Sequence, residues 1–182
     1  MTHRVAAAVL AALMTASCSS APARRGAAPA PGNGVRLSVP FFPDRGDQCG
    51  PSALAGVLRF WGRPEDPAAL REDLYRPDLK GSLTIDLMLA ARARGLEAEM
   101  VDGDMTLLKK ELDAGRPLLV FVNRGFASMP VNHFMVVTGY DDRGIYANTG
   151  PTRDAHLSYR AFQREWDKTD RWALVVSRGS KS

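Results

Sequence analysis

A cysteine and a histidine that lie far apart in the chain could together form a nucleophilic centre. Cys49 stands in the run DQCGPSAL, just before apolar residues with helical spacing, and Pro51 suits the first turn of that helix because it needs no backbone N–H there. A thiol at a helix N-terminus feels the positive end of the helix dipole, which favours the nucleophilic thiolate. The same cysteine could instead be a small apolar residue packed at a helix start.

His133 is the candidate base for this thiol. The chain has three histidines. His3 lies in a leader-like segment, and His156 lies in a polar stretch without periodicity. His133 opens the apolar run NHFMVVTGY, so the edge of a sheet could hold its ring rigidly, although a histidine at a strand end can also have no role.

Asn148 is the candidate for the third group, which would orient the imidazole. It ends the run IYAN, which is predicted to pair back on the histidine strand through a turn at Asp141–Gly144. A side chain on the adjacent strand can accept the imidazole N–H and so fix the tautomer. Asp141 and Asp142 are rival orienting groups, but they lie at the far end of this hairpin from His133.

The elements that must position these residues divide the chain into two halves. Helical patterns are predicted at 52–61, 67–75, 84–94, 105–114 and 158–166, and strand patterns at 35–39, 96–101, 118–122, 134–140, 145–148 and 172–177. Helices dominate the first half and strands the second. This order predicts an α+β fold rather than the regular alternation of a doubly wound sheet.

Residues 1–17 have the layout of a signal peptide. A short polar start with Arg4 precedes the apolar run Val5–Met14, which is too short to span a bilayer, and small residues then lead to Cys18. A cysteine directly after small residues resembles the cleavage box of bacterial lipoproteins, in which the cysteine is lipidated. That resemblance implies an exported protein held by a lipid on Cys18 at the periplasmic face of a bacterial membrane. The other interpretation is an ordinary signal peptide with an incidental cysteine.

Residues 18–34 predict a flexible tether, and residues 35–178 predict one folded domain. The tether is rich in Ala, Pro, Gly and Ser and lacks apolar periodicity. The chain has two cysteines, so Cys49 has no partner within the chain if Cys18 carries lipid. An unpaired thiol in an exported protein is a candidate reactive group. The alternative, a disulfide between the two cysteines, would tie the tether to the domain.

The composition argues against several classes of function. Lys and Arg total 24 against 20 Asp and Glu, and the two signs are interspersed, so nothing favours nucleic-acid binding. Two distant histidines and one cysteine do not make a zinc site, and no glycine-rich loop for phosphate is present. We therefore expect neither a metal nor a cofactor.

The order of a cysteine at a helix start, a histidine at a strand start and an amide on the next strand resembles the papain-like cysteine peptidases. More narrowly, the runs VPFFP and QCGPSALAGVLRFWG, with Gly81-Ser82 before a helix that ends in AARARGL, resemble the bacteriocin-processing (double-glycine leader) peptidases and their stand-alone relatives. The resemblance implies an N-terminal helical half packed on a C-terminal antiparallel sheet. It also implies that Cys49 cleaves a peptide or protein substrate through a thioester, with His133 as base and Asn148 as orienting group.

One position departs from that family. Such peptidases usually carry a glutamine that donates to the oxyanion where this chain has Asp44. An ionised carboxylate cannot donate and would repel the developing charge, so Gln48 is the substitute candidate beside the backbone N–H of Cys49. Two other interpretations stay open: a weak or inactive pseudopeptidase that binds a peptide or partner, and an acyltransferase similar to phytochelatin synthase.

Overall fold

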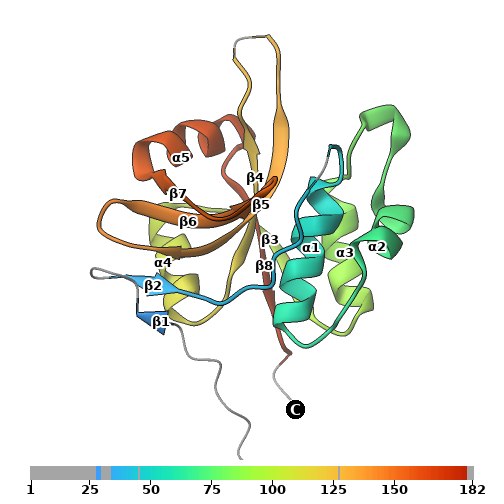
Figure 1. Cartoon of the computed structure of the whole chain (residues 1–182), viewed down its shortest axis with the longest axis horizontal. Coiled ribbons are helices and arrows are strands. Elements are labelled where there is room, and N and C mark those ends of the chain that lie inside the picture. The colour runs from blue at the N-terminus through green and yellow to red at the C-terminus, as the bar shows by residue number, and fades with distance from the viewer. Residues whose placement is uncertain (1–27, 30–33, 45, 127, 180–182) are drawn as a thin grey trace, which may run out of the picture.

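The computed structural model describes residues 28–29, 34–44, 46–126 and 128–179, and its core is an antiparallel sheet with helices on both sides (Figure 1). The strands are β1 (Ala28–Pro29), β2 (Val35–Arg36), β3 (Glu97–Asp102), β4 (Leu118–Asn123), β5 (Asn132–Tyr140), β6 (Gly144–Thr149), β7 (Thr152–Ser158) and β8 (Trp172–Ser177). The helices are α1 (Cys49–Phe60), α2 (Pro67–Leu74), α3 (Thr84–Ala93), α4 (Met105–Asp113) and α5 (Tyr159–Trp166), with 3₁₀ turns at Pro77–Leu79 and Asp167–Thr169.

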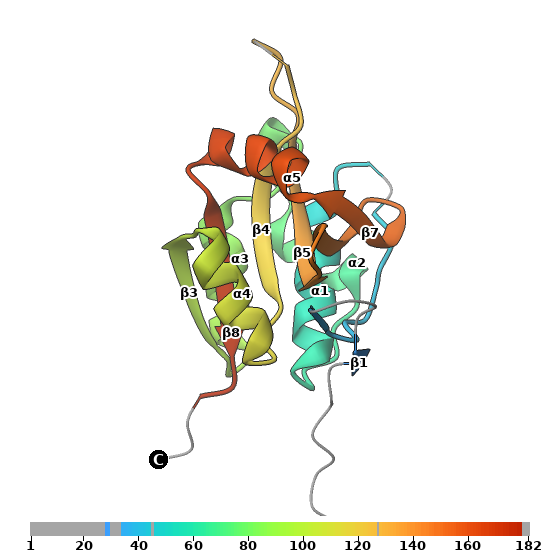
Figure 2. The same cartoon turned by 90° about the vertical axis from the view of Figure 1, so that its left-hand side faces the viewer.

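The sheet has the order β1-β2-β5-β4-β8-β3, and β6 pairs with both β5 and β7. Helices α1, α2 and α3 lie on one side of the strands, whereas α4 and α5 lie on the other (Figures 1 and 2). The predicted α+β fold, with an N-terminal helical half packed on a C-terminal antiparallel sheet, is therefore confirmed.

Three helices begin at side-chain caps, and α1 does not. Asp66 accepts from the N–H of Ala68 at the start of α2, and Asp104 accepts from the N–H of Leu107 at the start of α4. Ser158 caps α5 in the same way. The residue before α1, Gln48, makes no side-chain cap hydrogen bond, so α1 begins without the kind of cap that these three helices have.

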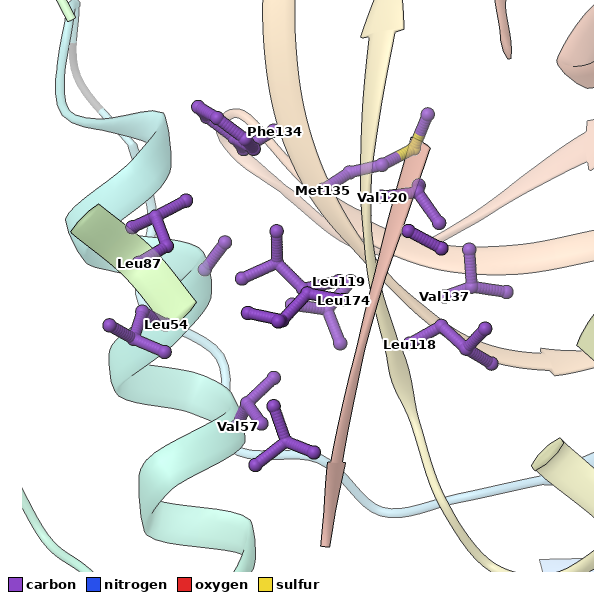
Figure 3. Packing of buried hydrophobic residues seen from close by; sticks show 14 of the residues in the cluster. Leu54, Val57, Leu87, Leu118, Leu119, Val120, Phe134, Met135, Val137 and Leu174 are labelled. Carbon is purple, nitrogen blue, oxygen red and sulfur yellow. The ribbon is translucent and has the colours of Figure 1, made fainter. Parts of the chain in front are cut away.

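Helix α1 is anchored in the core along almost its whole length. Leu54 and Val57 of α1 and Leu87 of α3 are fully buried and point toward Leu119 and Leu174 of the sheet (Figure 3). Burying a leucine side chain stabilises a fold by roughly 1.5–3 kcal/mol. Cys49, at the N-terminal end of α1, is thus held by a rigid element.

Two strands, β1 and β7, differ from the sequence prediction. β1 places Ala28–Pro29 against Val35–Arg36, so part of the segment expected to be a flexible tether joins the sheet. β7 lies where the sequence predicted no element, at the edge of the sheet beside β6. Among the described residues, no helix combines the length and apolar character needed to cross a bilayer.

Candidate active site

Cys49 is the first residue of α1, and its thiol is free. The sulfur of Cys49, a ring nitrogen of His133 and a carboxylate oxygen of Asp44 all lie within 4.8 Å of one another. The structure therefore brings together Cys49 and His133, which are 84 positions apart in the chain. This is the arrangement that a nucleophile and its base require.

His133 is buried near the start of β5, where it pairs in register with Val122 of β4. Its Nε2 lies 3.0 Å from the hydroxyl oxygen of Thr149, at the end of β6. Because Nε2 is engaged there, Nδ1 is the nitrogen left for the sulfur. The hydrogen bond to Thr149 thus fixes the direction in which the ring faces.

Thr149, and not Asn148, is hydrogen-bonded to the ring of His133, so the hydrogen bond predicted between Asn148 and His133 is absent among the described residues. The side-chain amide of Asn148 donates to the carbonyl of Val39 (3.3 Å), and its oxygen accepts from the N–H of Asp154 (3.0 Å). Successive side chains of a strand point to opposite faces, so only one of two neighbours can face the histidine. Asn148 thus links the segment that follows β2 to strand β7.

A cation lies close to this hydrogen bond. Arg124 donates from Nη2 to the hydroxyl of Thr149 over 2.5 Å, and its Nε lies 3.7 Å from Glu165. Burial and the charge of Arg124 lower the pKa of His133 to about 4. The imidazole is therefore neutral near pH 7 and can accept a proton.

The thiol is also neutral at rest. Burial raises the pKa of Cys49 and the charge of Asp44 raises it further, while the backbone N–H groups of Phe134, Gly50 and Cys49 lower it. The helix N-terminus therefore acts in the predicted direction, but burial outweighs it. The expectation that the helix start favours a thiolate does not hold for the resting protein.

Asp44 is fixed within the site by two hydrogen bonds. Its Oδ1 accepts from the backbone N–H of Gln48 (3.1 Å), and its own N–H donates to the carbonyl of Gly150 (2.9 Å). Burial raises the pKa of Asp44, and this effect exceeds the lowering by the N–H of Gln48. Gln48 itself does not line the pockets that Cys49 lines, and its role as an oxyanion donor stays a prediction.

Cys49 lines a pocket between the segment that leads into α3 and strands β4 and β5. Leu79 and Leu83 on its rim are 58% and 42% exposed, so the entrance is partly apolar. The other residues that line it are Lys80, Gly81, Ser82, Thr84, Phe121, Asn132 and Phe134. The segment before α3 and the loop between β4 and β5 extend at the same end of the molecule as the start of α1 (Figure 1).

The site also contains a donor set that the sequence analysis missed. From the sequence we expected no metal site because only histidines and cysteines were considered as ligands. The structure adds the carboxylate of Asp44 to Cys49 and His133, and such a trio can ligate a metal ion. Whether an ion binds these donors is not decided by their positions, so the expected absence of a metal stays a prediction.

The model of the Peptidase_C39 like family matches residues 36–174 of the chain. An uncharacterised protein of Methanothermobacter marburgensis is 36% identical over 100 residues, which are 55% of this chain and 63% of that protein. The chain thus matches less than two thirds of the length of this relative.

Two solved structures are similar over most of the domain. A double-glycine-motif protease from an AMS/PCAT transporter, in complex with the leader peptide, is 25% identical with a TM-score of 0.66, covering 79% of this chain and 94% of that one. The peptidase domain of Streptococcus ComA, a bifunctional ABC transporter involved in quorum sensing, is 26% identical with a TM-score of 0.65, covering 76% and 98%. These matches confirm the resemblance to bacteriocin-processing peptidases.

Proposed function

Because the chain belongs to the Peptidase_C39 like family, we propose that it is a cysteine peptidase with Cys49 as nucleophile and His133 as general base. The observation that carries this proposal is the meeting of the sulfur and the imidazole within 4.8 Å at the start of α1. The neighbour bound to a leader peptide supports a peptide or protein as substrate.

In the proposed reaction the proton moves during the attack and not before it. Both groups are neutral near pH 7, so Nδ1 of His133 takes the thiol proton as the sulfur of Cys49 bonds to the peptide carbonyl carbon. The peptide C–N bond then breaks, and the imidazolium gives its proton to the leaving amine. Water hydrolyses the thioester, with the same imidazole as base, and restores the thiol.

Thr149 acts as a positioning residue in this scheme. When Nε2–H donates to its hydroxyl, Nδ1 carries no proton and faces the sulfur. The hydroxyl is neutral, so it aims the ring without stabilising the imidazolium as a carboxylate would. The backbone N–H of Cys49 is the first oxyanion donor, and Asp44 stands where the second would be.

The experiment that tests the proposal is incubation of the purified protein with a peptide library, followed by mass spectrometry. We expect new peptide termini and, after rapid acid quenching, an acyl adduct on Cys49. Cys49→Ala should give neither. Cleavage that persists in Cys49→Ala would contradict the proposal, and peptide amides formed with added amine would indicate acyl transfer instead of hydrolysis.

A catalytically weak protein that binds peptides is the second candidate, and Asp44 is the observation that favours it. Its charge opposes both the thiolate and the oxyanion. In that case library peptides would be retained by the protein without any new termini. Leu83→Glu should then weaken retention, because it places a charge on the apolar rim of the pocket.

We also propose that the protein acts in the cell envelope as a lipoprotein anchored through Cys18. The support is the signal-like sequence of residues 1–17, which lies outside the residues that the structure describes. In bacterial cells, Cys18→Ser should move the protein from the membrane fraction to the soluble fraction. Persistent membrane association of this variant would contradict lipid anchoring.

A further inference from the structure

Three different metal ligands meet at the start of α1. We propose that Asp44, Cys49 and His133 bind one Zn²⁺ ion, or a cation of similar preference, which reversibly blocks the thiol. The binding stands on the donor geometry alone. The inhibition rests in addition on the proposed peptidase function.

The distances suit a small tetrahedral ion. The three donor atoms lie within 4.8 Å of one another. Donors around a tetrahedral zinc ion lie about 3.5 Å apart, as follows from bond lengths of about 2.0–2.3 Å. The remaining gap of ~1 Å is small enough for minor shifts of the three side chains to close it. The fourth position would face the pocket that Cys49 lines, where water or a substrate group can complete the shell.

The second layer of contacts already holds the ligands in place. Thr149 engages Nε2 of His133 and leaves Nδ1 as the metal-binding nitrogen. The N–H of Gln48 holds Oδ1 of Asp44, which leaves Oδ2 as the oxygen for the metal ion. Metal-binding histidines and carboxylates are usually fixed by outer hydrogen bonds of this kind.

The donor types select the ion. Thiolate and imidazole suit Zn²⁺ and Co²⁺, whereas Mg²⁺ and Ca²⁺ prefer all-oxygen sites. When the ion binds, a metal–sulfur bond replaces the S–H bond and the proton passes to solvent, without any redox change. The thiolate and the carboxylate then balance the two positive charges of the ion.

Asp44 is the residue that makes this site different from a catalytic cysteine–histidine pair. A glutamine amide, usual at this position in the peptidases that the chain resembles, is a poor zinc ligand. The carboxylate supplies a third, anionic ligand beside the pair. The same substitution that removes an oxyanion donor therefore creates a cation site.

The test is metal binding measured without any substrate. Calorimetric titration of the reduced protein with zinc chloride should show one ion per chain, and titration with magnesium chloride should show none. Cobalt chloride should produce the near-ultraviolet charge-transfer band of a cobalt–thiolate bond. Cys49→Ser should abolish that band, and Asp44→Asn should weaken zinc binding by at least about tenfold.

Asp142→Asn is the matched control, because it removes an exposed carboxylate far from the site and should leave the affinity unchanged. Circular dichroism of each variant separates lost ligands from lost folding. Zinc affinity that survives in both Cys49→Ser and Asp44→Asn, or a cobalt complex without the thiolate band, would overturn the proposal. Zinc binding by a protein without peptidase activity would refute the proposed function alone, whereas activity that zinc does not inhibit would refute the metal block alone.

Discussion

The two ends of the β5–β6 hairpin each hold a histidine beside an oxygen, but they differ in how completely the polar groups are paired. At the turn end, the buried carboxylate of Asp141 accepts from the hydroxyl of Tyr146 (2.8 Å) and faces Nε2 of His156 (3.2 Å). It also accepts from the backbone N–H groups of Arg143 and Gly144. Although burial alone would raise it, these hydrogen bonds bring the pKa of Asp141 below its usual range.

At the open end, His133 meets the neutral hydroxyl of Thr149 beside the cation Arg124, and its second ring nitrogen is left for the sulfur of Cys49. An aspartate–histidine pair would look like the better catalytic unit. Here that pair locks a turn, and the less well-paired histidine faces the thiol. The comparison teaches that a reactive site differs from a structural one less in the strength of its histidine–oxygen hydrogen bond than in having polar groups beside a pocket whose hydrogen bonds are not all made within the fold.

The largest expected effect separates the two histidines. His133→Ala should lower kcat/KM by at least about a thousandfold, because it removes the group proposed to take the thiol proton and return it to the leaving amine. His156→Ala should leave kcat/KM nearly unchanged and lower the thermal midpoint, because it removes a partner of a buried carboxylate. Kinetic assays and thermal unfolding of both variants check this. Equal losses of activity in the two variants would break the comparison.

A smaller effect is expected from Asp44→Gln. This change removes the charge beside the thiol and supplies an amide donor, so kcat/KM should rise by roughly a hundredfold. Asp47→Asn is the matched control, since Asp47 bonds to Tyr75 outside the site. Steady-state kinetics in the presence of a chelator measures both variants. A rate for Asp44→Gln no higher than that of the unmodified protein would show that Asp44 does not limit the reaction.

The smallest effect is expected from Thr149→Asp. The pKa of His133 lies at about 4, so activity should fall only as the pH drops through that value, where the base becomes protonated. A carboxylate at position 149 stabilises the imidazolium and raises this pKa, so the acid limb should move upward by about one pH unit or more. At pH 7 the rate should rise about tenfold. Thr149→Ser keeps a hydroxyl and should leave the acid limb of the pH profile unchanged. Measuring kcat/KM against pH for both variants tests this, and an unshifted acid limb in Thr149→Asp would contradict the prediction.

Most helices were predictable from the sequence because local signals set them. The segment predicted at 84–94 is α3 at Thr84–Ala93, and the one predicted at 105–114 is α4 at Met105–Asp113. Capping side chains and glycines after the last turn mark such ends within the chain itself. β7 was missed because its side chains are mostly half-exposed or exposed, so an apolar alternation is lacking.

The candidate site was predictable only in part, because it depends on register and on a loop. Cys49 and His133 carry recognisable patterns, but the choice between Asn148 and Thr149 depends on which face of β6 meets β5. A shift of register between Val137 and Gly139 lies in this pairing, and a one-residue error reverses the face. Asp44 lies in a segment without helix or strand, so no periodic pattern in the sequence predicts that it comes close to Cys49 and His133.

The position of β2 determines how the candidate active site of a tethered molecule would be oriented relative to the anchoring surface. β2 pairs with Tyr140 and Gly139, near the end of β5 opposite to His133. Gly139 lies six positions along the strand from the histidine, which is about 20 Å at 3.4 Å per residue. A chain anchored through its N-terminal segment would thus be held at one end of the domain, while the candidate active site lies at the opposite end. Such a molecule would meet its substrates from the surrounding fluid, with the anchoring surface behind it.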